Sequence, residues 1–324
     1  MKFVLQEMTF LRYFLPLIIE GNKRGLSSTV IMLPSRKYNC PYISQHTDQL
    51  KLLSEKYNFT LCNYGEENKN KEVVFLVEGV SKEKVSNKSK TISLCFSTDF
   101  TLGYERYIND VDHVVIVSKY VSEYYKKHSE KNLYLGSPKF DCVLDDDEIL
   151  KKYTLDPIRK KAIIFYPRTR DLGLCQLERI SSYLKELDYQ IIIKSRGKDP
   201  IQQNHKHLAE KCLYDFSWFP HTSLELIKVS DLIINFSSSV IEETTSYKKP
   251  MINFHIKPFT KPFEFLYDYS FVKNINQDFQ KKDFENAVIN LQNNNYSTEF
   301  KLANDLLFDT KNSSKDIIDF VVNI

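Results

Sequence analysis

Three serines in a row follow a short apolar run and precede a segment with the pattern of a helix; they are Ser237, Ser238 and Ser239. Hydroxyl groups beside the N–H groups that a helix leaves unpaired at its start attract anions. Ligands of parallel sheets bind outside the carboxyl ends of the strands, so the serines predict a phosphate site at that edge. Ser239 and Glu242 also fit an S-x-x-E capping box, which needs no ligand.

Basic side chains follow two other predicted strands in the same half of the chain. They are Arg168 and Arg170 in one loop, and Lys194 and Arg196 in another. Two or three such groups can neutralise a nucleotide diphosphate, and arginine can do so with bidentate geometry. The alternative for the arginines is a solvated loop whose salt bridges contribute little.

A group-transfer reaction also needs a base that accepts the proton of the acceptor. The candidates lie in the first half of the chain: Asp99 just past an apolar run, Glu78 at the end of another, and His46 in a predicted loop. An acidic residue at such a place also serves as a helix cap, and a lone histidine is often incidental. The three residues are therefore candidates for catalysis rather than a defined catalytic set.

Short apolar runs alternate with polar or helical segments and would position these groups. In the first half the runs are Lys2–Leu5, Ser28–Leu33, Thr60–Asn63, Glu72–Glu78, Thr91–Phe96 and His113–Ser118. In the second half they are Lys161–Tyr166, Tyr189–Lys194, Leu213–Phe216, Leu232–Ile234 and Met251–Phe254, and the segments after Phe254 are mostly helical. This alternation predicts an α/β fold with parallel sheets. We expect two domains, residues 1–148 and residues 149–324, the second including the terminal helices.

Length, composition and charge bound the class of protein. The chain has 324 residues, of which 27% are charged and 42% hydrophobic, as in soluble globular proteins. A net charge of +3 argues against nucleic acid as a principal partner. Six cysteines without ligand spacing indicate neither a zinc site nor a disulfide framework, so we expect a reducing cytoplasm. Phe14–Ile19 is too short to span a membrane, and peripheral attachment to the inner face of a membrane stays open.

The segment Ser230–Phe254 resembles the nucleotide-binding signature of GT-B glycosyltransferases and their relatives: strand, small polar residues, a helix with an acidic residue, and a strand that begins with proline. In that family the acidic residue seven positions before the proline holds the ribose hydroxyls, which here points to Glu243 and Pro250. Two departures stand out. Lys248 replaces a common glycine, and Asn235 stands where retaining members of the EX7E type carry a second glutamate, which favours an inverting enzyme.

Other segments resemble one GT-B branch, the CDP-glycerol glycerophosphotransferases. Gly136–Asp141 is similar to the G-x-P-[KR]-x-D signature that ends their N-terminal domain, and Pro167–Asp171 to the P-x-x-R-D loop of their C-terminal domain. Lys194 matches the lysine of their K-x-H-P motif, but Arg196 replaces the histidine that serves their phosphoryl chemistry. UDP-GlcNAc 2-epimerases share the architecture, although Ser238 and Ser239 replace their Gly-Gly. Trp218 lies in the loop where GT-B relatives receive the nucleobase, with a core position as its alternative.

The resemblance implies a GT-B fold: two Rossmann-like domains that face each other across a cleft, followed by C-terminal helices. It implies an inverting, metal-independent glycosyltransferase of surface polysaccharide biosynthesis, with a nucleotide sugar as donor, a glycan or lipid-linked acceptor, and no cofactor. A polyol-phosphate transferase that uses a CDP-glycerol-type donor is the first alternative, followed by a 2-epimerase-like enzyme and a non-catalytic nucleotide-binding partner. The expected donor ligands are Arg168, Arg170, Lys194, Arg196, Trp218, Ser237, Ser238, Ser239 and Glu243.

Overall fold

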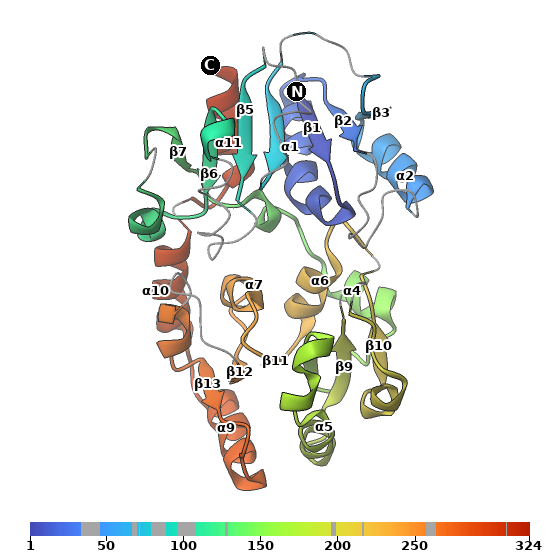
Figure 1. Cartoon of the computed structure of the whole chain (residues 1–324). Helices are drawn as coiled ribbons and strands as arrows, with labels where there is room; N and C mark the ends of the chain where they lie inside the picture. The colour runs from blue at the N-terminus through green and yellow to red at the C-terminus, as the bar shows by residue number, and fades with distance from the viewer. Residues whose placement is uncertain are drawn as a thin grey trace. The chain divides into compact units, whose positions relative to one another are not determined.

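The computed structural model describes residues 1–33, 46–66, 70, 72–78, 89–95, 108–126, 129–195, 199–215, 217–256, 264–308 and 310–324 (Figure 1). The chain forms two compact units. The first consists of Met1–Cys142 together with Leu306–Ile324, and the second of Val143–Asp305. Each unit is built around a parallel sheet, so the predicted α/β class is confirmed.

The first unit contains a seven-stranded sheet in the order β3-β2-β1-β4-β5-β6-β7. Its strands are β1 (Lys2–Leu5), β2 (Thr29–Met32), β3 (Thr60–Asn63), β4 (Val74–Val77), β5 (Thr91–Leu94), β6 (His113–Ile116) and β7 (Asn132–Tyr134). Every residue of β1, β4 and β5 is buried. Strands that are covered on both faces consist of continuous apolar runs, which is why the sequence revealed them.

Helices α1 (Leu11–Lys23), α2 (Thr47–Tyr57) and α11 (Ser313–Val322) belong to this unit. In α1 the residues at helical spacing are fully buried, namely Leu11, Phe14, Leu15 and Ile18. Lys23, in the last turn, is exposed. This apolar stripe is the side that an amphipathic helix turns toward a core, and α1 also packs against α11.

The second unit contains a six-stranded parallel sheet in the order β10-β9-β8-β11-β12-β13. Its strands are β8 (Lys161–Phe165), β9 (Gln190–Lys194), β10 (Lys211–Leu213), β11 (Leu232–Asn235), β12 (Met251–Phe254) and β13 (Val272–Ile275). Its helices are α4 (Asp146–Tyr153), α5 (Leu177–Glu186), α6 (Thr222–Val229), α7 (Val240–Ser246), α9 (Lys281–Asn293) and α10 (Ser297–Leu307), the last of which crosses the division at Asp305. Between β9 and β10 the chain forms a 3-10 helix at Gln203–Leu208.

Helix α11 lies in a different unit from the one that the sequence predicted. We expected the terminal helices in the second domain, but α11 is part of the first unit, and the second unit begins at Val143. The physical reason is a set of contacts between α11 and two distant parts of the chain, α1 and the segment Gly136–Asp141. Local sequence patterns carry no information on such long-range contacts.

Gly136 and Asp141 contact the first two residues of α11. Gly136 has φ +77°, and a Cβ at this position would lie 2.2 Å from Ser313 Oγ. The Asp141 carboxylate accepts the N–H of Ser314, one of the groups that a helix leaves unpaired at its start. Burial raises the pKa of Asp141, although hydrogen bonds from Ser314 oppose the shift. The G-x-P-[KR]-x-D segment therefore holds the C-terminal helix.

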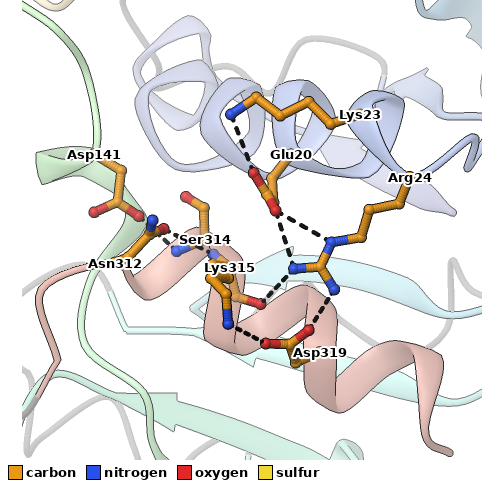
Figure 2. A network of polar contacts seen from close by, with 8 residues as sticks. All are labelled: Glu20, Lys23, Arg24, Asp141, Asn312, Ser314, Lys315 and Asp319. Carbon is orange, nitrogen blue, oxygen red and sulfur yellow. Dashed lines mark hydrogen bonds and ion pairs between the residues drawn. The ribbon is translucent and has the colours of Figure 1, made fainter.

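Ion pairs join α1 to the middle of α11 (Figure 2). The Arg24 guanidinium donates to the Glu20 carboxylate at 3.0 and 3.1 Å and to the Asp319 carboxylate of α11. Lys315 Nζ also donates to Asp319, at 2.8 Å. Burial acts to raise the pKa of Glu20, but the hydrogen bonds from Arg24 and Lys23 outweigh it, and the pKa is lowered. The network therefore adds ion pairs to the packing of α11 on α1.

Candidate functional site

The order of strands in the second sheet defines where a ligand is expected. From the central strand β8 the chain proceeds to β9 and β10 on one side, and it later returns to fill β11, β12 and β13 on the other. In open α/β sheets ligands bind at such a switch point, outside the carboxyl ends of the strands. The loops that follow β8 and β11 carry Arg168 and the three serines, so two of the predicted groups flank this point.

Ser237 shapes the turn after β11 instead of offering its hydroxyl to a ligand. It has φ +48°, and its N–H donates to Asn253 Oδ1 at 3.0 Å. Its Oγ accepts the N–H of Ile256 at 3.2 Å and lies 3.4 Å from the carbonyl oxygen of Phe254. The role of Ser237 as a direct phosphate ligand, predicted from the sequence, is therefore not supported by its contacts.

Ser238 and Ser239 present hydroxyls that are half-buried and make no hydrogen bond within the part of the chain that the structure describes. The N–H of Ser238 is already used, because it donates to Asn235 Oδ1 at 3.3 Å. Ser239 is the residue before α7, but its side chain makes no capping hydrogen bond. The expected capping box with Glu242 is therefore wrong, and Glu242 is instead fully buried.

Glu243 lies in the first turn of α7, on the helix that follows the serines, as the resemblance required. The residue is buried, with 7% of its surface exposed. The contact with ribose hydroxyls that the resemblance implies for Glu243 stays a prediction.

Lys194 ends β9 and is buried in a cluster of charges. Its ammonium forms an ion pair with Asp215, and His221 Nε2 lies 3.4 Å from the same Asp215 carboxylate. His221 Nδ1 accepts the N–H of Ser223 at 3.2 Å, so the ring proton is on Nε2 and faces Asp215. Asp215 thus balances the charge of Lys194.

Asp215 was not among the predicted site residues, although its position after β10 could have indicated it. Leu213, the last residue of β10, pairs with Lys194 in the sheet, and Asp215 follows two positions later. Neighbouring carboxyl ends of parallel strands meet at one edge, so an acidic residue just past β10 was placed to meet this lysine.

The remaining donor ligands predicted for this unit differ in exposure. Arg168 and Arg170 are exposed, and Arg170 Nε lies 3.6 Å from the Asp171 carboxylate, a surface pair of little energy. Trp218 is 1% exposed, so no face of its ring is open to a base, and its burial agrees with the core alternative. Arg196 lies outside the described residues.

Of the three candidate bases, the structure describes Glu78 and His46. Glu78 follows β4, which neighbours β1 at the switch point of the first sheet, and it adopts φ +32°. His46 precedes α2 without a side-chain cap, and burial lowers its pKa. Asp99 lies outside the described residues. Within the first unit, Glu78 therefore occupies the position at which this type of sheet places ligands.

Comparison with known proteins identifies the architecture. No protein-family model matches the sequence, and no curated protein matches it either. Solved structures do match. The UDP-GlcNAc 2-epimerase of Neisseria meningitidis bound to UDP-GlcNAc is similar with a TM-score of 0.66 and 13% identity, over 100% of both chains. The chain has the GT-B fold.

Two further GT-B structures are similar over nearly the whole chain. The UDP-GlcNAc 2-epimerase of Methanocaldococcus jannaschii, in complex with UDP-GlcNAc and UDP, has a TM-score of 0.63 and 13% identity over 100% of both chains. The wall teichoic acid polymerase TagF with CDPG has a TM-score of 0.65 and 15% identity, over 99% of this chain and 88% of that one. At these identities the likeness concerns the GT-B fold alone.

The described residues contain neither a grouped set of metal-binding side chains nor a helix that could span a membrane. Among them, no group of three or more histidine, cysteine, aspartate or glutamate side chains is arranged to hold a metal ion. None of the helices formed by these residues combines the length and the apolar character of a membrane span.

Proposed function

We propose that the protein uses a nucleotide-activated sugar as donor and transfers the sugar, with inversion and without a metal, to a glycan or lipid-linked acceptor in surface polysaccharide biosynthesis. One observation carries the proposal. The hydroxyls of Ser238 and Ser239 lie at the carboxyl edge of the second sheet, beside its switch point, with no hydrogen-bonding partner in the described chain. We place the reaction in the cytoplasm, with attachment to the inner face of a membrane as an open alternative.

Each group receives a role in this proposal. Ser238 and Ser239 donate hydrogen bonds to the donor diphosphate, and Glu243 accepts hydrogen bonds from the ribose hydroxyls. Arg168 and Arg170, which are exposed in the loop after β8, supply positive charge to the leaving diphosphate. Arg196 adds charge after β9, whereas Lys194, the last residue of that strand, is already paired with Asp215. The base that accepts the proton of the acceptor is one of Glu78, Asp99 and His46.

A second reaction stays under consideration because structures with two kinds of ligand are similar to this chain. UDP-GlcNAc is bound in the Neisseria structure and CDPG in the TagF structure. In sugar transfer, the bond between the sugar carbon and the diphosphate oxygen breaks, and a nucleoside diphosphate leaves. In polyol-phosphate transfer a P–O bond of the diphosphate breaks, and CMP leaves. A 2-epimerase-like reaction and a non-catalytic nucleotide-binding role are the remaining alternatives.

Incubation with a panel of UDP-, CDP-, GDP- and ADP-linked sugars and with CDP-glycerol tests the function. We expect a nucleoside diphosphate as product, and a rise in melting temperature with the matching nucleotide, because a ligand that binds the folded state stabilises it. Release of CMP would instead support the polyol-phosphate alternative. If no nucleotide or nucleotide sugar raises the melting temperature, the proposal is wrong.

Two serine variants link the result to the site. Replacing both Ser238 and Ser239 by alanine should weaken nucleotide binding, because the variant loses two hydroxyl donors. The matched control is Ser246→Ala, at the opposite end of α7, where the side chain is also half-buried. Equal binding by the double variant and by the control would show that the phosphates bind elsewhere.

A further inference from the structure

Three asparagines lie side by side on neighbouring strands of the second sheet. In the register of the sheet Asn235 of β11 pairs with Asn253 of β12, which pairs with Asn274 of β13. Asn235 Nδ2 donates to Asn253 Oδ1 at 3.1 Å, and Asn253 Nδ2 donates to Asn274 Oδ1 at 3.0 Å. Asn235 and Asn253 are completely buried, whereas Asn274 is exposed. We call this row the asparagine ladder.

Backbone groups fix the orientation of every amide in the ladder. The N–H of Ser237 can only donate, so the atom it meets on Asn253 is the oxygen. The N–H of Ser238 identifies the oxygen of Asn235 in the same way, at 3.3 Å. At the other end Asn274 Nδ2 donates to the carbonyl oxygen of Tyr267 at 2.9 Å, and a carbonyl can only accept. The ladder therefore has one consistent hydrogen-bond direction.

The ladder is hydrogen-bonded to the turn after β11, which carries Ser237, Ser238 and Ser239 and is called the serine turn. Ser237 has φ +48°, a conformation that L-residues rarely adopt and that persists where the surroundings over-determine it. Here the N–H of Ser237 donates to Asn253 Oδ1, and the N–H of Ser238 donates to Asn235 Oδ1. The carbonyl oxygen of Ser238 accepts a hydrogen bond from Asn235 Nδ2 at 3.3 Å. The Tyr267 hydroxyl donates to the same carbonyl at 3.3 Å. The turn is thus attached directly to β11, β12 and Tyr267, and Asn274 of β13 holds both Asn253 and the backbone of Tyr267.

Packing of the sheet does not require asparagine at positions 235 and 253. Positions 235 and 253 are completely buried in a parallel sheet, where apolar side chains serve as well and carry no desolvation penalty. A fully satisfied buried polar network instead specifies one conformation of the groups it contacts. The contacted group here is the turn that carries Ser238 and Ser239.

We propose that Asn235, Asn253 and Asn274 are positioning residues, which hold the turn so that the hydroxyls of Ser238 and Ser239 meet the diphosphate of the donor. The inference rests on the proposed function, because it assigns the diphosphate to these serines. The asparagines themselves do not touch the donor. They act through the backbone of Ser237 and Ser238.

Three variants with two measurements test the ladder. Asn253→Leu keeps the number of side-chain heavy atoms and their branching and removes the central amide. Asn274→Ala removes the exposed end, and Lys273→Ala, on the same strand as Asn274, is the matched control. The first measurement is hydrogen exchange of the Ser237 and Ser238 amides without ligand. The second is the affinity for whichever of UDP, CDP, GDP and ADP the wild type binds, compared with the affinity for the corresponding nucleoside.

We expect faster exchange of the Ser237 amide in Asn253→Leu and nucleoside diphosphate binding that is weaker by roughly 10- to 100-fold, since small misplacements of binding groups have effects of this size. Nucleoside binding should change little, because a nucleoside has no phosphate to meet the serines. A merely structural role would weaken both ligands alike. Asn274→Ala should show a smaller loss in the same direction, and Lys273→Ala should match the wild type.

Each outcome decides between the two proposals. A folded Asn253→Leu variant that binds the diphosphate as the wild type does overturns the positioning role, while the proposed function survives. Equal weakening of diphosphate and nucleoside binding also overturns that role. If Asn253→Leu does not fold, Asn274→Ala decides, and an affinity equal to that of Lys273→Ala refutes the role. Absence of binding by the wild type refutes the proposed function and the positioning role with it.

Discussion

Replacing Gly136 by alanine tests how the first unit holds its last helix. Gly136 has φ +77°, and the added Cβ would lie 2.2 Å from Ser313 Oγ and 2.8 Å from Thr310 Cγ2. The left-handed backbone costs a non-glycine residue about 1–2 kcal/mol. Overpacking adds about 1–3 kcal/mol, so the free energy of unfolding should fall by roughly 2–5 kcal/mol.

Gly25→Ala is the matched control for the backbone part of this effect. Gly25 has φ +74°, but nothing lies within 4 Å of its added Cβ. Urea unfolding should therefore show a loss of about 1–2 kcal/mol for Gly25→Ala, and a clearly larger loss for Gly136→Ala. The difference between the two variants measures the contact with α11.

A second substitution locates the clash. In the Gly136→Ala background, Ser313→Ala removes the oxygen at 2.2 Å and should restore part of the lost stability. Limited proteolysis should also release the C-terminal segment faster from Gly136→Ala than from the wild type. If Gly136→Ala and Gly25→Ala lose the same free energy, α11 does not pack against Gly136, and the contact described here is mistaken.

Three further predictions concern buried or half-buried groups. Lys194→Met leaves the buried Asp215 carboxylate without its ion-pair partner, so the free energy of unfolding in urea should fall by roughly 3–5 kcal/mol. The double variant Lys194→Met/Asp215→Asn should recover part of this loss. Burial raises the pKa of Asp141 above its usual 3.8, so its contribution to stability is fully present below pH 3.8 and is lost as the pH rises through the folded pKa. In Asp141→Asn the free energy of unfolding, measured against pH, should lack this decrease. Burial raises the pKa of the Cys175 thiol to about 12, so iodoacetamide at neutral pH should label Cys175 only on unfolding, and rapid labelling of the native protein would contradict its burial.

Much of the second unit could be predicted from local patterns. The apolar run before Ser237 and the run Met251–Phe254 are β11 and β12, and the segment between them contains α7. Because the strands are parallel and their carboxyl ends meet at one edge, the serines and Lys194 were expected on the same side of the sheet. The resemblance of Ser230–Phe254 to the GT-B signature implied the GT-B fold, which the structural neighbours confirm.

What the sequence could not show depends on register and on long-range contacts. Asn235, Asn253 and Asn274 are separated by 18 and 21 positions, and they become neighbours only once the pairing of three strands is known. Ser237 has φ +48° and its N–H donates to Asn253, a contact that likewise depends on the pairing of β11 with β12. The contact between Asp141 and Ser314 joins residues 173 positions apart, which no local pattern reveals.

The return of the chain to its first unit has a consequence for anyone who divides the protein. Val143–Asp305 is continuous, so one cut at each end excises the whole second sheet with its serine turn. The other half is made of two pieces, and a fragment that stops at Cys142 leaves the face of α1 bare where Asp319 meets Arg24. A chimera that exchanges the second unit should therefore be spliced at two junctions, with the native tail rejoined after the graft.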